Sequence, residues 1–193
     1  MLASDQHSAS SLLSTYATGL RDSINQLTTT SFDNIHTYEL DCTLLNDFGH
    51  KPIQCETTLK FITDIEEHNH LPAVYWFEIT SDHDSKEIYQ SVVELKKTSV
   101  RNMPAYKKLF STWTSKVLYV GKVKNNLAGR MLLHLGYNTT PSVQGLQLCH
   151  WPNKDGLKLK LNVIYLPQDL DMLAGVFELK LAGHLNPILG KHR

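Results

Sequence analysis

The chain has 193 residues, of which 41% are hydrophobic and 20% charged, and its 19 basic side chains balance 19 acidic ones. This composition is typical of a globular domain and argues against an intrinsically disordered chain. No segment approaches the run of about 20 apolar residues that a transmembrane helix needs, and the N-terminus lacks the pattern of a signal peptide, so we expect a cytoplasmic protein with no membrane partner. The isolated cysteines Cys42, Cys55 and Cys149 are expected to be reduced thiols.

The charges are distributed unevenly along the chain. Residues 1–95 contain 4 basic and 15 acidic side chains, whereas residues 96–193 contain 15 basic and 4 acidic ones. Such an asymmetry is typical of proteins with a nucleic-acid partner, because a basic surface attracts phosphates irrespective of their sequence. The alternative is that the acidic half packs against the basic half and neutralises it. Composition alone leaves both interpretations open.

Residues 1–70 are expected to form an acidic, mostly helical extension. Apolar residues at helical spacing predict a helix over Ser11–Leu27, and Thr57–His68 predicts a second helix that ends before Pro72. Between them, Tyr38–Leu45 and Lys51–Cys55 are predicted as weak strand or loop. Because this part contains no recognisable chemical motif, we expect it to wrap the rest of the chain or to bind a protein partner, including a second copy in a homodimer.

Residues 71–193 are expected to form the functional domain. Runs of β-branched and aromatic residues, or strict alternation, predict strands, and apolar residues at helical spacing predict helices. The predicted strands are 73–79, 117–123 and 157–163, the predicted helices are 87–97, 103–112, 127–135 and 169–184, and residues 81–116 form an insertion between the first two strands. This order predicts an α+β fold with a small mixed β-sheet flanked by helices.

Three polar residues lie in predicted helices where they could carry chemistry. Arg130 and His134 are four residues apart and therefore leave the same helical face, and a guanidinium beside an imidazole suits a site that binds phosphate and moves a proton. Glu178 lies in the most apolar helix of the chain, where an inward-facing carboxylate must be paired or metal-bound. Each has an ordinary alternative, because all three side chains could equally face solvent.

The order of these residues resembles the motif order of the GIY-YIG nuclease family. A strand with Ala73-Val74-Tyr75 is followed by a strand with Tyr119-Val120-Gly121. Arg130 and His134 follow on a helix, then Glu178 on a late helix, and then Leu185-Asn186-Pro187. The resemblance covers roughly residues 72–193. Tyr119-Val120-Gly121 with the helix that follows it is the most specific part.

The chain departs from the family pattern in two places. Ala73 and Val74 stand where the family name has Gly and Ile, which is a small change within a strand that keeps Tyr75. The two strand motifs are usually joined by a short hairpin, whereas here Trp76–Leu118 intervene, which is more similar to the restriction-enzyme branch. The insertion contains basic residues that could hold a DNA backbone or could simply be solvated: Lys96, Lys97, Arg101, Lys107, Lys108 and Lys116.

The resemblance implies a metal-dependent endonuclease that hydrolyses phosphodiester bonds in DNA, in restriction or another defence system. It implies a single Mg²⁺ or Mn²⁺ ion held by Glu178, and stabilisation of phosphoryl charge by Arg130. Tyr75 and Tyr119 would flank the attacking water, with one of them as the general base. A tyrosine of ordinary pKa, about 10, needs nearby cations to act as a base at neutral pH.

The remaining implied roles concern proton transfer and substrate contacts. His134 would relay the proton, Asn186 would order the site by hydrogen bonding, and the substrate-binding residues would be Lys122, Lys107 and Lys108. Two other functions stay open: a catalytically silent nucleic-acid-binding module of the same fold, and a protein-docking role for the acidic N-terminal half. The sequence also leaves open DNA or RNA as the substrate. One active site cuts one strand, so double-strand cleavage would require a dimer or sequential nicking.

Overall fold

The computed structural model describes residues 2–29, 35–45, 56–98, 102–106, 114–137, 142–151 and 156–190. The strands are β1 (His36–Asp41), β2 (Ala73–Ile79), β3 (Val117–Val123) and β4 (Lys158–Tyr165). The helices are α1 (Leu2–Thr29), α2 (Glu56–Glu66), α3 (Ser85–Thr98), α4 (Leu127–Leu135) and α5 (Ala174–Leu185), with the 3₁₀ helices η1 (Cys42–Leu44) and η3 (Gln168–Leu173). The predicted α+β class is confirmed.

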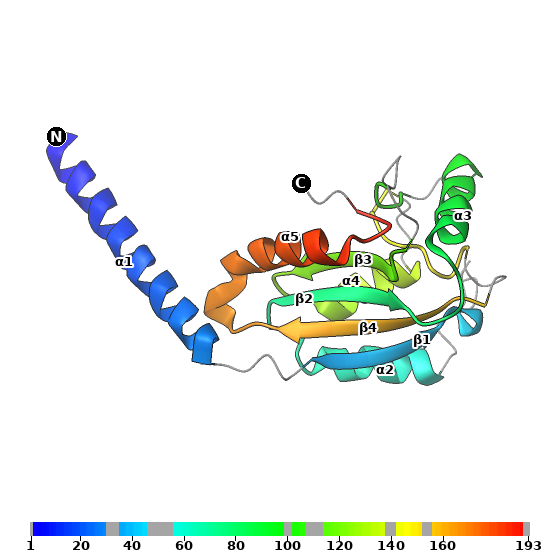
Figure 1. Cartoon of the computed structure of the whole chain (residues 1–193). Helices are drawn as coiled ribbons and strands as arrows, with labels where there is room; N and C mark the ends of the chain where they lie inside the picture. The colour runs from blue at the N-terminus through cyan, green and yellow to red at the C-terminus, as the bar shows by residue number, and fades with distance from the viewer. Residues whose placement is uncertain are drawn as a thin grey trace.

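The strands form one sheet in the order β1-β4-β2-β3, and each neighbouring pair is antiparallel (Figure 1). The prediction of a mixed sheet was therefore wrong for these four strands. The physical reason lies in the insertion between β2 and β3, which starts and ends at the same end of the sheet, where the Ile79 N–H donates to the Lys116 carbonyl at 2.7 Å. A connection that returns to its starting end gives antiparallel neighbours, whereas parallel neighbours need a crossover.

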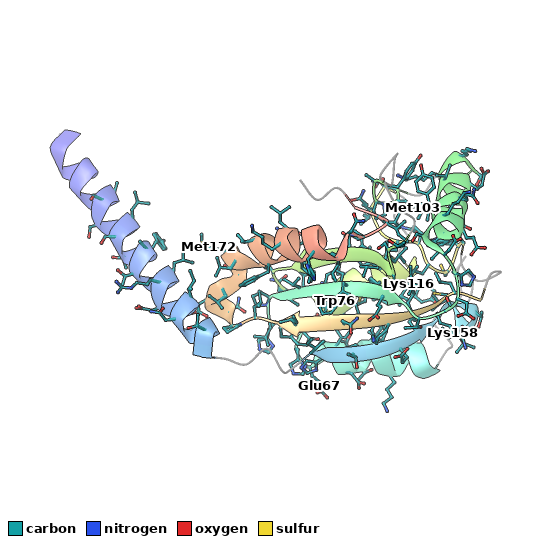
Figure 2. The ribbon with its side chains drawn as sticks, viewed as in Figure 1. Glu67, Trp76, Met103, Lys116, Lys158 and Met172 are labelled. Carbon is teal, nitrogen blue, oxygen red and sulfur yellow. The ribbon has the colours of Figure 1, made fainter. Side chains whose placement is uncertain are left out.

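The sheet is covered by helices on both faces, which explains why β2 is apolar almost throughout. Tyr75 and Phe77 belong to the main core, to which α2 and α4 contribute. Val74 and Trp76 point to the opposite face and pack in two smaller clusters with residues of η3 and α5 (Figure 2). Side chains of β2 therefore alternate between the two faces, and the odd-numbered positions face α4.

Residues on both sides of the boundary expected at residue 70 contribute to the same core. β1 pairs with β4, and Phe61, Ile62 and Ile65 of α2 belong to the main core. By contrast, α1 projects from the body (Figure 1) and meets η3, where the Ser23 hydroxyl donates to Asp169 at 2.5 Å. Among the described helices, none combines the length and the apolar character needed to cross a membrane.

Two predicted helices differ in the structure. The helix predicted over 169–184 is divided into η3 and α5, which meet at Leu173 and Ala174. The helix predicted over 103–112 is not helical in its described part, because Met103 precedes Pro104 and is thereby biased towards extended backbone. Tyr106 instead forms an isolated bridge with Leu189. Residues 107–112, and the weak strand predicted at 51–55, lie outside the described residues.

Along β4, two ion pairs between described residues join the basic half of the chain to its acidic half. Lys158 of β4 lies 3.8 Å from Asp41 of β1, and Lys160 lies 3.0 Å from Glu78 of β2. The positive charges of these two β4 lysines are therefore partly neutralised by carboxylates of the neighbouring strands. This observation supports the alternative in which the two halves pack together, at least along β4.

Candidate active site

Four of the predicted site residues converge between the sheet and α4. Tyr75 of β2 and Tyr119 of β3 project towards α4, whose His134 ring lies 5.7 Å from the Tyr75 ring and 5.1 Å from the Tyr119 ring, centre to centre. Tyr75 pairs across the strands with Gly121. A Cβ at Gly121 would lie 2.5 Å from the Tyr75 hydroxyl and 2.7 Å from the Tyr119 ring, so only glycine leaves room for both tyrosines.

The helix α4 is held in place by caps at both of its ends. Asn126 adopts a left-handed conformation (φ 57°), and its Oδ1 accepts from the Gly129 N–H at 3.0 Å. Asn69, which follows α2, accepts from the Ala128 N–H at 2.9 Å and thereby caps the same helix. Gly136 ends α4 with φ 93°. These caps fix where α4 points its Arg and His side chains.

His134 is fully buried and hydrogen-bonded at both ring nitrogens. The Leu146 backbone N–H donates to Nδ1 at 3.2 Å, so Nδ1 carries no proton, and Nε2 lies 2.8 Å from the Tyr75 hydroxyl. In the neutral ring the proton is therefore on Nε2, which donates to the Tyr75 oxygen. Burial and the nearby Arg130 charge hold the pKa of His134 well below 6.5, which keeps the ring neutral at neutral pH.

The Arg130 guanidinium also donates a hydrogen bond to the Tyr75 hydroxyl oxygen. Its Nε donates to the Tyr75 oxygen at 3.3 Å, and its Nη1 donates to the Gln144 carbonyl at 3.0 Å. A hydrogen bond to Arg130 also lowers the pKa of Tyr119. The Tyr75 oxygen therefore accepts from both His134 and Arg130. Two donors on one phenol oxygen favour its deprotonated form.

Burial opposes this effect at both tyrosines. Desolvation and the neighbouring Tyr119 raise the pKa of Tyr75, the Arg130 charge lowers it, and the Glu178 carboxylate raises it, with a net upward shift. For Tyr119, burial and Glu178 raise the pKa and Arg130 lowers it, again with a net upward shift. Both hydroxyls are therefore protonated at neutral pH unless further positive charge enters the site. The same shifts show that Glu178 lies within electrostatic reach of both tyrosines.

Glu178 forms an ion pair with Lys122. The Lys122 Nζ of β3 lies 3.5 Å from Oε2 of Glu178, and the glutamate side chain is 21% exposed. The sequence left two alternatives for Glu178, a side chain that faces inward and one that faces solvent. In the structure the side chain is intermediate, because it is partly exposed. The carboxylate lies where solvent and a ligand can still reach it.

A divalent cation at Glu178 would have one protein carboxylate as its ligand and would keep most of its water. The described part of the chain contains no group of three or more His, Cys, Asp or Glu side chains placed to hold a metal ion. Mg²⁺ does not require such a group, because proteins commonly hold it by one or two carboxylates while water and substrate phosphate oxygens complete its shell. Glu178 would be the protein ligand, and it would supply the negative charge.

Three predicted site residues remain, and of these the structure describes Asn186. Asn186 is exposed and caps the C-terminus of α5 in a left-handed conformation (φ 49°). Lys107 and Lys108 lie outside the described residues. Three of the described insertion lysines have partners within the chain: Lys96 lies over the Tyr106 ring, Lys97 pairs with Glu94, and Lys116 donates to the His83 carbonyl.

The segment 142–151 contacts Arg130 and His134 through its backbone, which no pattern in the sequence indicated. The Gln144 carbonyl accepts from Arg130, and the Leu146 N–H fixes the protonation of His134. The Leu146 carbonyl accepts in turn from the Trp151 indole at 2.8 Å. Backbone groups have no residue-type signature, so no motif could reveal these contacts. The cap by Asn69 was also missed, although asparagine is a frequent cap residue.

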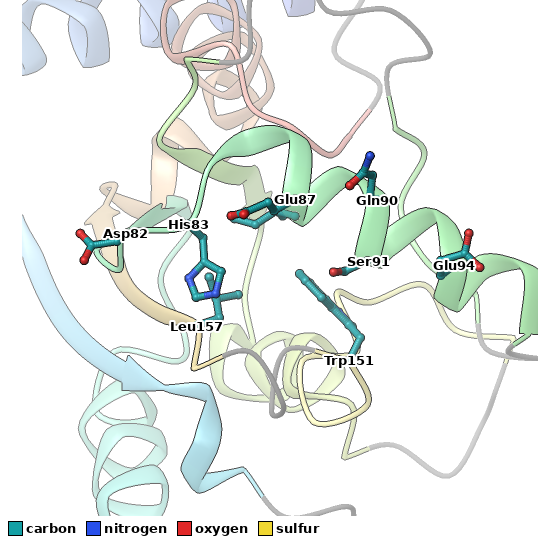
Figure 3. A pocket seen from close by; sticks show the side chains of 9 residues that line it. Asp82, His83, Glu87, Gln90, Ser91, Glu94, Trp151 and Leu157 are labelled. Atoms are coloured by element: carbon teal, nitrogen blue, oxygen red, sulfur yellow. The ribbon is translucent and has the colours of Figure 1, made fainter.

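A separate cavity of about 720 Å³ lies between α3, Trp151 and the start of β4 (Figure 3). Its polar lining consists of Asp82, His83, Glu87, Gln90, Ser91 and Glu94. Glu87 and Asp84 accept from each other's backbone N–H groups at 3.2 and 2.8 Å, which caps the start of α3, and Glu94 pairs with Lys97. These carboxylates have structural roles, and the cavity is distinct from the tyrosine cluster.

Comparison of the chain with protein-family models, with curated proteins and with solved structures finds no match. The function is therefore inferred from the geometry of the cluster and from the motif order.

Proposed function

We propose that the chain is a metal-dependent endonuclease of the GIY-YIG type, acting on DNA. The observation that supports this most strongly is the Tyr75 hydroxyl, which accepts hydrogen bonds from the neutral His134 and the charged Arg130 at the centre of the cluster. A core tyrosine needs only one partner to satisfy its hydroxyl. Two donors, one of them charged, suit an oxygen that carries negative charge during a reaction.

Under this proposal Tyr75 is the general base, because its oxygen has both donors. His134 cannot accept the Tyr75 proton at Nε2, since that nitrogen already carries one, so it stabilises the phenolate as a donor. Arg130 provides the fixed positive charge and can contact a phosphoryl oxygen through its remaining N–H groups. Tyr119 lies beside Tyr75, at 6.3 Å between ring centres, and positions the attacking water.

Glu178 would hold one Mg²⁺ or Mn²⁺ ion. When bound, such an ion stabilises charge on phosphoryl oxygens and lowers the pKa of coordinated water. Glu178 is placed so that its own charge raises the pKa of both tyrosines. Neutralisation of that carboxylate would therefore bring the tyrosine pKa values down, which links occupancy at Glu178 to the activation of Tyr75.

Plasmid cleavage in Mg²⁺ or Mn²⁺ tests the proposal. We expect nicking by the wild type, none by Glu178→Ala, and none by the wild type in EDTA. Glu94→Ala is the matched control, because this glutamate is exposed on α3 and pairs with Lys97. Cleavage that survives Glu178→Ala would contradict the assignment of that residue.

The second candidate function is a silent nucleic-acid-binding module. It is favoured by the upward shift in the pKa of Tyr75, which is unfavourable for a base. Filter binding of the same plasmid and of single-stranded DNA and RNA separates the two functions. A wild-type protein that binds these nucleic acids but cleaves none of them in either metal would support the silent module and refute the nuclease.

A further inference from the structure

We infer that Lys122 is a built-in counter-ion of Glu178 that competes with a divalent cation for this carboxylate. The inference rests on the proposed function, since it concerns the metal site of that enzyme. It assigns to the lysine a role in the metal-free protein that differs from substrate binding. Three observations support it: the ion pair, the close approach of Lys122 to Gly175 of α5, and the face of β3 on which Lys122 lies.

The ion pair places the ammonium on the metal-binding carboxylate. Lys122 Nζ lies 3.5 Å from Glu178 Oε2, and the two side chains are 45% and 21% exposed. On β3, Tyr119 belongs to the main core on the α4 face, whereas Val120 packs in the cluster beneath α5. Because neighbouring strand residues alternate, Lys122 lies on the α5 face with Val120. The lysine therefore approaches Glu178 along the face on which α5 lies.

The helix α5 leaves a specific space for this ammonium. A Cβ at Gly175 would lie 2.6 Å from Lys122 Nζ and 3.8 Å from its Cε. Gly175 precedes Glu178 by three residues, so both lie on the same side of the helix. An alanine at this position would force the Lys122 ammonium to move from the position in which it pairs with the carboxylate.

Two consequences follow for the site. Without metal, Lys122 neutralises Glu178 and lowers the affinity for a cation, because a second positive charge at this position would be repelled. A cation that binds Glu178 releases the ammonium, whose flexible stem can then reach a substrate phosphate. Metal binding and substrate contact are thereby linked through one side chain.

Titration of the full chain with Mn²⁺ alone, without nucleic acid, tests the inference by following free Mn²⁺ with electron paramagnetic resonance. We expect Lys122→Met to bind Mn²⁺ about two- to fivefold more tightly than the wild type, which is the size that a partly exposed ion pair allows. Gly175→Ala should shift the affinity in the same direction, because it displaces the ammonium and keeps the charge on the chain.

Two matched variants control for general effects. Lys124→Met removes the next lysine, which pairs with Asp171 at 3.1 Å, and Gly183→Ala adds a methyl group to α5 where nothing lies within 4 Å. Both should bind Mn²⁺ as the wild type does. Thermal melts of these four variants and of Glu178→Ala without metal establish that each is folded.

The outcomes separate this inference from the nuclease proposal. If Glu178→Ala abolishes Mn²⁺ binding while Lys122→Met and Gly175→Ala bind no more tightly than the wild type, the competition is refuted and the nuclease proposal stands. If neither the wild type nor Lys122→Met binds Mn²⁺ at millimolar concentrations without nucleic acid, the competition is refuted, and the nuclease proposal is decided by plasmid cleavage, where substrate phosphates can complete the metal shell. Tighter binding by Lys124→Met to the same degree would also overturn the inference, since the effect would then be one of overall charge.

Discussion

Gly121→Ala should disrupt the candidate site more than its small change in volume suggests. The added Cβ would lie 2.5 Å from the Tyr75 hydroxyl, 2.6 Å from Tyr75 Cζ and 2.7 Å from Tyr119 Cε1. These atoms belong to rigid rings, and both tyrosines are packed in the main core. One of the rings must therefore move, and Tyr75 cannot move without lengthening its bonds to His134 and Arg130.

The expected magnitudes follow from these contacts. Forcing a methyl group into a packed core costs about 1–3 kcal/mol of stability. A shift of Tyr75 that breaks its bond to His134 leaves a buried N–H without an acceptor, which adds a cost of about 1–3 kcal/mol. For the proposed nuclease, a displacement of about 1 Å at the base can reduce the cleavage rate about 10²-fold.

Urea denaturation and plasmid nicking measure the two effects separately. Gly183→Ala is the control, because nothing lies within 4 Å of the added Cβ, and it should be neutral or stabilising by up to about 1 kcal/mol. A Gly121→Ala protein with the stability of the wild type would refute the packing argument. If Gly121→Ala also cleaved DNA at the wild-type rate, the position of Tyr75 would not depend on a glycine at residue 121.

Three further predictions concern the same cluster. Tyr75→Phe should abolish cleavage and lower the free energy of unfolding by about 1–3 kcal/mol, since His134 Nε2 loses its buried acceptor; nicking assays and urea denaturation measure both, and a variant of unchanged stability would contradict the hydrogen bond. Because the pKa of His134 in the folded chain lies well below 6.5, the unfolded chain binds an extra proton as the pH falls below that value, so stability should fall by up to about 1.4 kcal/mol per pH unit. Urea midpoints between pH 7 and 5 test this, and His134→Gln should show a smaller slope than the wild type. Gly136→Ala should cost at least about 1 kcal/mol by thermal or urea unfolding, because it combines φ 93° with a Cβ 2.7 Å from Cys149 Sγ, and an unchanged midpoint would contradict this cap.

The sequence predicted those parts of the site that depend on local patterns. The bounds of α4 follow from an asparagine cap, helical apolar spacing and a terminal glycine, and each of these signals acts within a few residues. The strands 73–79 and 117–123 follow from continuous apolar runs, which is what a sheet covered on both faces requires. The pairing of Arg130 with His134 on one face is a consequence of helical geometry alone.

What the sequence could not predict depends on contacts between distant segments. Asn69 caps α4 from the part of the chain that was expected to be an extension, and β1 completes the sheet from the same part. The antiparallel pairing of β2 with β3 depends on where the insertion returns, which no local pattern specifies. Leu146 acts through its backbone N–H, so its side-chain type carries no information about the role.

The balance of charges around Tyr75 connects the proposed chemistry with the ion pair at Glu178. Two hydrogen-bond donors on the Tyr75 oxygen favour the phenolate, whereas burial disfavours it and raises the pKa of the hydroxyl. The net shift is upward, so Tyr75 is protonated at neutral pH. The Glu178 charge adds to the upward shift, and Lys122 offsets that charge while it remains paired. A cation of higher charge at the same carboxylate would offset it more completely. In the proposed nuclease, Tyr75 would therefore become a base only when a divalent cation takes the place of Lys122 at Glu178, and it would stay protonated in the metal-free protein.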